Sequence, residues 1–215
     1  MTPDIAAEKR VAAEAAAALV EDGMRVGLGT GTTVAQLVPA LGHRGLAITC
    51  AATSPATEVL ARAHGLDVRP FTDIGRLDLA IDGADQVDPA GWLVKGGGGA
   101  QTRERIVAAA ADRFVVIVSS DKPVPRLHAP VPLELLAFGL AATMHALGDA
   151  VLRDAPPTPD GGVLADYHGE LGDPSRLSAR LEAVPGVVSH GLFPPSMVST
   201  VLIARGDAVE ARRIS

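Results

Sequence analysis

Two short segments of this chain bring together side chains that could transfer protons on a small anionic substrate. Asp82-Gly83-Ala84-Asp85 places two carboxylates three positions apart, directly after an apolar run that favours a β-strand. Lys95 then precedes four consecutive glycines, and the helix predicted after them carries Glu104. Carboxylates can act as general acids or bases, while an amine and glycine-loop amides can stabilise developing oxygen charge. The candidate catalytic residues are therefore Asp82, Asp85, Lys95 and Glu104.

A second glycine-rich loop, Gly27 to Thr33, follows a predicted strand and precedes a predicted helix. Its backbone amides, its threonine hydroxyls and the helix N-terminus favour binding of an anion. The match to the dinucleotide pattern G-x-G-x-x-G is incomplete and no Walker lysine follows, so a single phosphate is favoured over a nucleotide. The alternative is a tight turn with a threonine helix cap. Candidate substrate-binding residues here are Thr30, Gly31, Thr32 and Thr33.

Each of these segments also has a purely structural interpretation. The two aspartates could belong to a solvated turn, and most helical glutamates face solvent. Four consecutive glycines are harder to explain, because they cost conformational entropy unless the backbone approaches something closely. Lys122, after a later strand, and Lys9, on the first helix, could contact an anion or be ordinary solvated charges. The remaining candidates for substrate binding are Gly83, Ala84, Gly96, Gly97 and Gly98.

Composition restricts the class of protein. A net charge of -6 argues against a general nucleic-acid surface. The single cysteine, Cys50, excludes an intrachain disulfide and is compatible with a cytoplasmic location. None of the six histidines lies near the aspartates or shows ligand spacing, so a metal site is not expected. Apolar stretches are too short to span a membrane, and the N-terminus lacks the apolar core of a signal peptide.

The elements that must position these side chains alternate between strands and helices up to about residue 120. With 47% hydrophobic but only 3% aromatic residues, the core must consist of aliphatic side chains. Alternation of this kind predicts βαβ units, and hence an α/β fold with a mostly parallel, Rossmann-like sheet and helices on both faces. The predicted strands are 24–28, 47–51, 66–69, 77–81 and 114–118, and the predicted helices are 4–21, 34–41, 53–64 and 102–111.

A change in amino-acid composition indicates a second, smaller unit. Four prolines between residues 121 and 132 indicate a connector. A small inserted α+β, ferredoxin-like lobe is expected to follow, with helices at 135–147 and 174–183, short strands around Val151 and Val163, and a strand at 186–192. A last strand, 197–204, is expected to return to the first sheet. The expected domains are thus 1–130 with 197–215, and 131–196.

Taken together, these segments resemble the A-type ribose-5-phosphate isomerases. The shared motifs run in order through nearly the whole chain: residues 27–33, 53–58, 82–85, 95–104, 120–122 and 185–193. One glycine cluster would be weak evidence, whereas this ordered set is specific. The least similar parts are 131–138, 156–162 and the C-terminus, and no proposed active residue is altered.

The resemblance implies the reversible interconversion of D-ribose 5-phosphate and D-ribulose 5-phosphate through an enediolate, in the non-oxidative pentose phosphate pathway, without metal or organic cofactor. Glu104 would be the base that moves a proton between C1 and C2. Asp82, Asp85 and Lys95 would line the reacting end of the sugar. Lys122, the threonine loop and the glycine loop would contact the substrate, and Lys9 is a weaker match. A homodimer or homotetramer is also implied.

Two other classes of function compete with this interpretation. A non-catalytic sugar-phosphate sensor is possible on such a fold, but the chain keeps every candidate acid and base and has no basic helix-turn-helix segment. A sugar-phosphate deaminase or a coenzyme A transferase is the other alternative. A deaminase should accept an amino sugar phosphate, and a transferase should form a thioester on a glutamate. Product analysis separates them.

Overall fold

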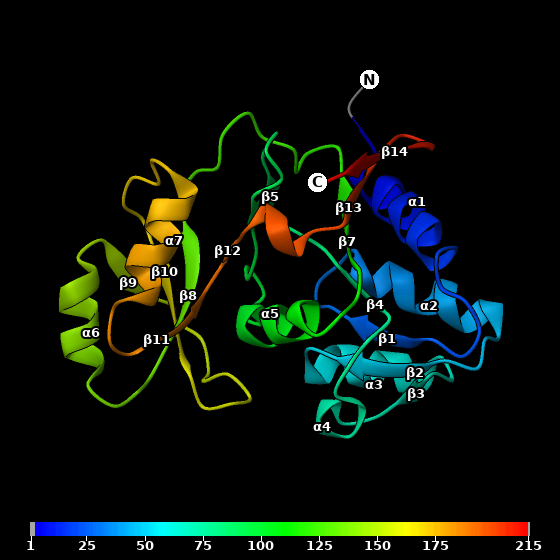
Figure 1. The fold of residues 1–215 in the computed structure, drawn as a ribbon, viewed down its shortest axis with the longest axis horizontal. Coiled ribbons are helices and arrows are strands. Elements are labelled where there is room, and N and C mark those ends of the chain that lie inside the picture. Colours follow the sequence, from blue (N-terminus) through cyan, green and yellow to red (C-terminus); the bar gives the residue numbers. More distant parts are fainter. Residues whose placement is uncertain (1–2, 215) are drawn as a thin grey trace.

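The computed structural model describes residues 3–214, which form three β-sheets (Figure 1). The largest has seven strands in the order β14-β13-β7-β4-β1-β2-β3. Neighbouring strands run parallel, except that β14 is antiparallel to β13. These strands are β1 (Arg25–Leu28), β2 (Thr49–Ala52), β3 (Asp67–Val68), β4 (Leu79–Asp82), β7 (Phe114–Ser119), β13 (Thr200–Arg205) and β14 (Ala208–Arg213).

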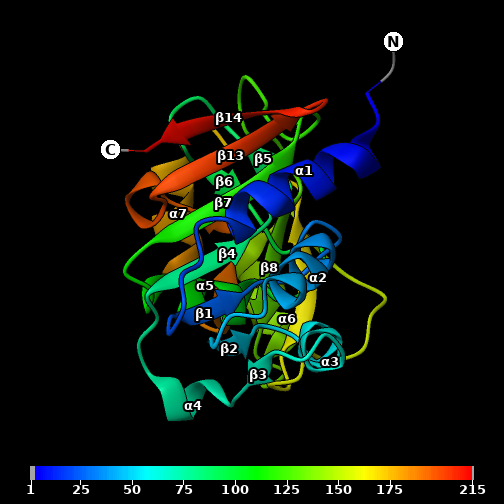
Figure 2. The same cartoon turned by 90° about the vertical axis from the view of Figure 1, so that its right-hand side faces the viewer.

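Helices cover both faces of this sheet (Figure 2). Successive strand residues point to opposite faces, so one strand contributes to two cores. In β7, Val115 and Ile117 pack with α1, α2 and α3, whereas Val116 and Val118 pack with α5 and the short α4. The helices are α1 (Ile5–Ala17), α2 (Val34–Arg44), α3 (Pro55–Ala63), α4 (Phe71–Ile74) and α5 (Gln101–Ala109).

Three adjacent strands in the middle of the sheet bring distant segments of the chain together. Strand β4 lies between β1 and β7, and all three run parallel. Their carboxyl ends therefore meet at one edge, where ligands bind in open α/β sheets. The glycine-threonine loop follows β1, Asp82 is the last residue of β4, and Lys122 lies just beyond the end of β7.

A four-stranded antiparallel sheet, in the order β11-β8-β10-β9, forms a smaller lobe. Its β-α-β-β-α-β succession is the ferredoxin-like pattern. Residues such as Leu133, Tyr167 and Leu177 give it a core of its own. Its elements are β8 (Val131–Leu135), α6 (Leu140–Leu147), β9 (Ala150–Leu152), β10 (Val163–Tyr167), α7 (Pro174–Glu182) and β11 (Val187–His190).

A three-stranded sheet, β12-β6-β5, combines two strands from the segment before α5 with one strand from the segment after β11. It consists of β5 (Gln86–Val87), β6 (Leu93–Val94) and β12 (Leu192–Phe193), and a 3-10 turn, η1 (Pro195–Met197), follows β12. The predicted fold class, a mostly parallel α/β sheet with a small α+β lobe, is confirmed. No helix within residues 3–214 is long and apolar enough to cross a membrane.

Two predicted elements of the smaller lobe are wrong. The predicted connector ends in strand β8, and the helix expected from residue 135 begins only at Leu140. Pro132 hid this strand, because proline cannot donate to a ladder; its carbonyl nonetheless accepts from the Gly191 N–H at 2.7 Å. The strand expected at 186–192 is two strands, β11 and β12, which belong to different sheets. Gly191 between them approaches the Lys95 carbonyl so closely that a Cβ would collide with it.

Candidate active site

A cavity of about 130 Å³ lies at the carboxyl edge of β1, β4 and β7. The loops after these strands line it together with the glycine loop before α5 and with residues of α1 and α5. Every site residue predicted from the sequence lines this cavity except Asp82, which is buried and contacts Lys95. The lining residues are Lys9, Thr30, Gly31, Thr32, Thr33, Gly83, Ala84, Asp85, Lys95, Gly96, Gly97, Gly98, Glu104 and Lys122.

Three buried charges form the centre of the site. The ammonium of Lys95 lies 2.9 Å from Oδ2 of Asp82 and 3.2 Å from Oε2 of Glu104. It also donates to the Gly83 carbonyl at 2.5 Å. All three charged side chains are 5% exposed or less. Burial of two carboxylates with one ammonium is costly unless each is paired, and here the ammonium serves both.

Asp82 is held from two directions. Its Oδ1 accepts hydrogen bonds from the N–H groups of Thr30 (3.1 Å) and Gly83 (2.7 Å), while Oδ2 contacts Lys95. The carboxylate therefore joins the loop after β1 to the loop after β4. This explains why an aspartate ends a buried apolar strand, where an unpaired charge would be strongly unfavourable.

Burial and mutual contact shift the pKa values of all three charged side chains. Burial raises the pKa of Glu104, and the nearby Asp82 charge raises it further, so that against the opposing effect of Lys95 it reaches about 8. Burial likewise raises the pKa of Asp82. Burial alone would lower the pKa of Lys95, but the charges of Asp82 and Glu104 outweigh it and the pKa is raised. Lys95 therefore stays charged, and Glu104 is the group that exchanges a proton near neutrality.

One carboxylate oxygen of Glu104, Oε2, is buried beside Lys95 and receives no well-formed hydrogen bond from any group within residues 3–214. An oxygen in this state keeps its lone pairs for an incoming proton. A carboxyl group whose pKa lies close to neutrality can both take a proton from carbon and return it.

The glycine loop is attached to the other aspartate. Asp85 is exposed, and its Oδ2 accepts from the Gly97 N–H at 2.9 Å. Gly96 has a φ of +98°, a conformation that favours glycine. Asp82 and Asp85 therefore differ in environment: the first is buried against Lys95, and the second lies at the rim with a backbone partner. This difference separates the two carboxylates, which the sequence could not do.

The cavity-lining residues outside the buried cluster include threonines and two lysines, which suit a phosphate. Thr30 to Thr33 precede the N-terminus of α2, where Thr33 forms no side-chain cap and the helix dipole favours an anion. The Thr30 hydroxyl is held by Thr53 at 2.7 Å. Lys9 and Lys122 add positive charge from two other elements, and Lys122 also pairs with Asp121 at 3.0 Å. The arrangement can therefore bind a dianion while the buried cluster faces the rest of the molecule.

Glu8 supports this end of the site and was not predicted. It is 3% exposed, and its carboxylate accepts from the N–H groups of Ser120 at 2.8 Å and Gly206 at 2.9 Å. It thereby fixes α1, which carries Lys9, against the loop that carries Lys122. The signal in the sequence was weak, since a helical Glu beside Lys and Arg normally faces solvent.

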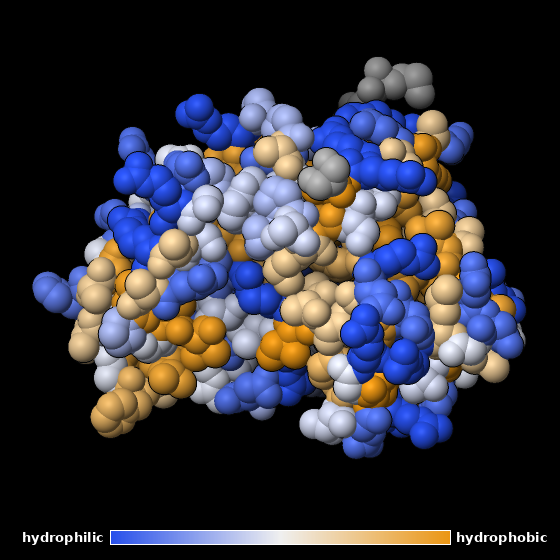
Figure 3. Space-filling view, viewed as in Figure 1, coloured by the Kyte–Doolittle hydropathy of each residue, from blue (hydrophilic) through white to orange (hydrophobic). Residues whose placement is uncertain are grey.

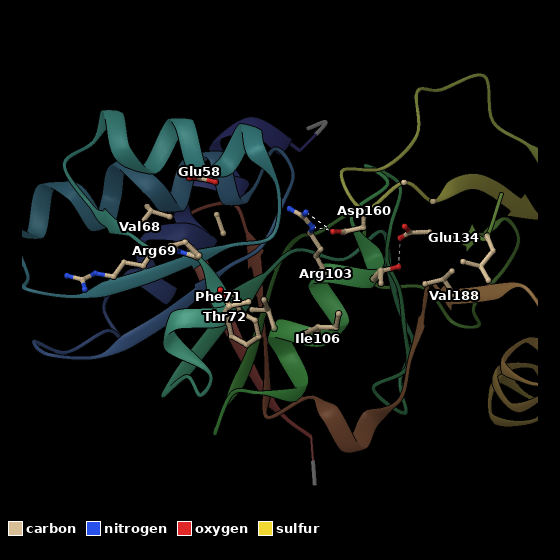
Figure 4. A pocket seen from close by; sticks show the side chains of 17 residues that line it. Glu58, Val68, Arg69, Phe71, Thr72, Arg103, Ile106, Glu134, Asp160 and Val188 are labelled. Carbon is tan, nitrogen blue, oxygen red and sulfur yellow. Dashed lines mark hydrogen bonds and ion pairs between the residues drawn. The ribbon is translucent and has the colours of Figure 1, made fainter. Parts of the chain in front are cut away.

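The helix that carries Glu104 is clamped by the smaller lobe (Figure 4). Arg103 forms two hydrogen bonds with Asp160, of 2.6 and 2.8 Å, and Glu134 accepts from the hydroxyls of Thr102 and, at 2.6 Å, Thr158. A cavity of about 630 Å³ is bordered by four of these residues, Thr102, Arg103, Glu134 and Asp160. At 3.6 residues per turn, Thr102 faces nearly opposite Glu104, so this larger cavity is separate from the 130 Å³ cavity that Glu104 lines.

Arg105 is a second unpredicted anchor of this helix. Its guanidinium lies 4.4 Å from the centroid of the Phe193 ring and donates to the carbonyls of His190 at 2.8 Å and Leu192 at 2.5 Å. The ring of Phe193 also lies 5.6 Å from the Lys95 ammonium. One aromatic ring thus lies near two cations, those of Arg105 and Lys95. Only the fold brings residues 105 and 193 together, so this contact could not be predicted from the sequence.

The described residues contain no group of three or more His, Cys, Asp or Glu side chains placed to hold a metal ion. The positive charge at the centre of the site comes from Lys95. The arrangement therefore offers a buried base, an adjacent ammonium, backbone amides and an anion-binding loop, all facing a small cavity.

Comparison with known proteins identifies the family. The model of the family "Ribose 5-phosphate isomerase A (phosphoriboisomerase A)" matches residues 49–208. A ribose-5-phosphate isomerase A of Methylorubrum extorquens is 46% identical over 95% of this chain and 94% of its own. One of Roseobacter denitrificans is 46% identical over 96% and 87%.

Solved structures agree. The structure of ribose 5-phosphate isomerase A from Neisseria gonorrhoeae superimposes on this one with a TM-score of 0.94 at 29% sequence identity, over 100% of both chains. A D-ribose-5-phosphate isomerase in complex with phospho-erythronic acid has a TM-score of 0.91 at 31% identity, over 99% of this chain and 100% of its own. The chain therefore belongs to the ribose 5-phosphate isomerase A family.

Proposed function

We propose that this protein interconverts D-ribose 5-phosphate and D-ribulose 5-phosphate through an enediolate. The observation that carries the proposal is the buried contact of Lys95 with Glu104 at 3.2 Å beside a cavity with a phosphate-binding loop. An aldose–ketose isomerisation is internally balanced: C2 is oxidised as C1 is reduced. It needs no external oxidant, only a base and stabilisation of oxygen charge.

Glu104 removes the proton from C2 of the open-chain aldose, and the electron pair moves into the C1–C2 bond while charge develops on the C1 oxygen. Lys95 and the amides of the glycine loop stabilise that charge. Protonated Glu104 then returns the proton to C1, and the C2–O bond becomes the ketone carbonyl. One carboxyl group thus serves as base and acid, which suits its pKa of about 8.

The remaining proton movements are assigned to the aspartates. Opening of the furanose ring and transfer between O1 and O2 require a group that can exchange protons with oxygen. Asp85, exposed at the rim, is placed to exchange protons with solvent and substrate. Asp82 keeps Lys95 charged and in position. The substrate phosphate is assigned to Thr30–Thr33, Lys9 and Lys122.

The experiment is a coupled assay of the purified protein with ribose 5-phosphate in the presence of EDTA, beside Glu104→Gln. Ketose formation by the wild type and a loss of about 10²- to 10⁴-fold in the variant support a metal-independent isomerase with this base. Binding of the sugar phosphate without turnover by a folded wild-type protein would contradict it.

The sensor alternative is not favoured. A module that only binds a sugar phosphate gains nothing from two carboxylates and an amine buried together, which costs free energy that simple binding would not repay. Glucosamine 6-phosphate as substrate, and a search for a coenzyme A thioester on Glu104, test the deaminase and transferase alternatives in the same assay.

The protein is further proposed to be a homo-oligomer in the cytoplasm, a dimer or a tetramer. Support comes from apolar side chains exposed near α6, where hydrophobic surface is visible (Figure 3). Phe138 is 92% exposed and Leu136 is 52% exposed. Exposed apolar patches of this kind commonly mark protein interfaces. The oligomer is tested by measuring the molar mass of the wild type and of Phe138→Asp by light scattering.

We also propose that the chain has two domains, one formed by residues 1–130 with 197–215 and the other by residues 131–196.

A further inference from the structure

An arginine of the smaller lobe, Arg153, forms hydrogen bonds with two peptide carbonyls of the glycine loop. Nη1 of Arg153 donates to the carbonyl of Gly96 at 3.0 Å and to that of Gly97 at 3.2 Å. Arg153 directly follows β9, and its own N–H donates to the Leu164 carbonyl at 3.0 Å. The guanidinium therefore reaches from the four-stranded sheet to the loop that lines the catalytic cavity.

Arg153 is itself fixed in direction. Its Nε and Nη2 bind the two carboxylate oxygens of Asp166 at 2.8 and 2.6 Å. Asp166 lies on β10, which is paired on both sides by β8 and β9. Both side chains are about one-fifth exposed. A planar guanidinium can bind a carboxylate with one edge and carbonyls with the remaining nitrogen, whereas a lysine ammonium cannot reproduce this fork.

Holding these carbonyls determines where the loop's N–H groups point. In a trans peptide the C=O and the following N–H point in opposite directions. With the Gly96 and Gly97 carbonyls turned toward Arg153, the N–H groups of Gly97 and Gly98 are turned away from it, and that of Gly97 meets Asp85. Glycine peptides have little intrinsic preference for one orientation, so an external restraint decides it.

We propose that Arg153, held by Asp166, is a positioning residue that keeps the Gly97 amide on Asp85 and the Gly98 amide directed at the cavity. A reversed peptide would present a carbonyl oxygen where negative charge develops, and would repel it. Lys95, which directly precedes the loop, is also attached to the lobe, since its N–H donates to the Gly191 carbonyl at 2.8 Å. The lobe thus helps to form the site without contributing a reacting group. The kinetic part of this proposal rests on the proposed isomerase function.

The test compares Arg153→Ala, Arg153→Lys and Asp166→Asn with Arg180→Ala. Arg180 is a matched control, because it also binds a β10 residue, Tyr167, but lies outside the cavity lining. Arg153→Ala is expected to lower kcat about 10- to 100-fold, as for a small misplacement of catalytic groups. Arg153→Lys should recover little of this, and Asp166→Asn in the Arg153→Ala background should add nothing.

Two readouts separate positioning from a general loss of structure. Inhibition by inorganic phosphate, assigned to the threonine loop, should change less than about twofold in Arg153→Ala. Amide hydrogen exchange over residues 95–100 should accelerate in Arg153→Ala and Arg153→Lys but not in Arg180→Ala. If the alanine variant does not fold, Arg153→Lys carries the test.

Unchanged kcat or unchanged exchange in a folded Arg153 variant would overturn the proposal, as would an equal loss of kcat in Arg180→Ala. Amide hydrogen exchange can be measured whether or not the protein is catalytically active. If the wild type lacks isomerase activity but loop exchange still depends on Arg153, the proposed function fails and the restraint on the loop stands.

Discussion

The ammonium of Lys95 lies 3.2 Å from Oε2 of Glu104, and both side chains are buried. Because Lys95 also binds Asp82 at 2.9 Å, two carboxylates share one positive charge. Burial raises the pKa of Glu104 and the neighbouring Asp82 charge raises it further, so that its value of about 8 lies near the pH at which a base is most useful.

The pH profile follows from this shift. Glu104 must be ionised to accept a proton from carbon, so kcat/KM should rise as pH increases through about 8 and level off above it. Stopped assays between pH 6 and 10, with coupling enzymes added afterwards, measure the profile. A rate constant that is flat from pH 6 to 9 would contradict the assignment.

The free energy of unfolding should also depend on pH because of the proton on Glu104. The pKa of Glu104 is raised from 4.5 to about 8, so the stability associated with its protonated form is complete below about 4.5 and is lost as pH rises through about 8. Glu104→Gln does not titrate and should keep it. The melting temperature of the variant relative to wild type should therefore be higher at pH 9 than at pH 5.

A control for this measurement is Glu58→Gln. Glu58 pairs with Arg62 on the surface at 2.9 Å, with both side chains about half exposed. Such a pair contributes little, so its melting difference should be small and should not grow with pH. A Glu104→Gln difference equally independent of pH would mean that Glu104 does not titrate as described.

Lys95→Met removes the ammonium that pairs with two buried carboxylates. At pH 8 the free energy of unfolding should fall by about 3–5 kcal/mol, as when one partner of a buried ion pair is deleted. At pH 5.5 the loss should be smaller, because the carboxyl groups can become neutral. Urea denaturation at both pH values measures it; equal losses would contradict the described coupling.

Lys122→Ala tests the phosphate end of the cavity. Loss of a charge-assisted contact should raise KM about 10- to 100-fold with little change in kcat, and should weaken inhibition by inorganic phosphate to the same degree. Arg126→Ala is the control, since it removes an exposed cation from the same connector but not from the cavity. An unchanged KM in Lys122→Ala would remove this residue from the phosphate site.

Much of the site could be predicted because its parts lie at the ends of parallel strands. Once β1, β4 and β7 were recognised as buried runs, their following loops had to meet at one edge. The glycine loop and Glu104 follow within a short span, so local sequence sufficed for them. For this reason the structure brings all the predicted residues together.

The supports of the site could not be predicted in the same way. Arg153 lies 56 or 57 positions from the carbonyls it binds, and Glu8 lies 112 positions from Ser120. In sequence each is an ordinary charge beside other polar residues. Strand β8 was missed because Pro132 contradicts strand propensity, while tertiary pairing with β10 and β11 decides the conformation.

The most direct test follows hydrogen at C1. Wild type and Glu104→Gln are incubated with ribose 5-phosphate in D₂O, and the ribulose 5-phosphate is examined by proton and carbon NMR. We predict deuterium at C1 with the wild type, because a proton held on Glu104 exchanges while the enediolate persists, and neither turnover nor labelling above background with the variant. Wild-type rates and labelling in folded Glu104→Gln would show that another group moves the proton.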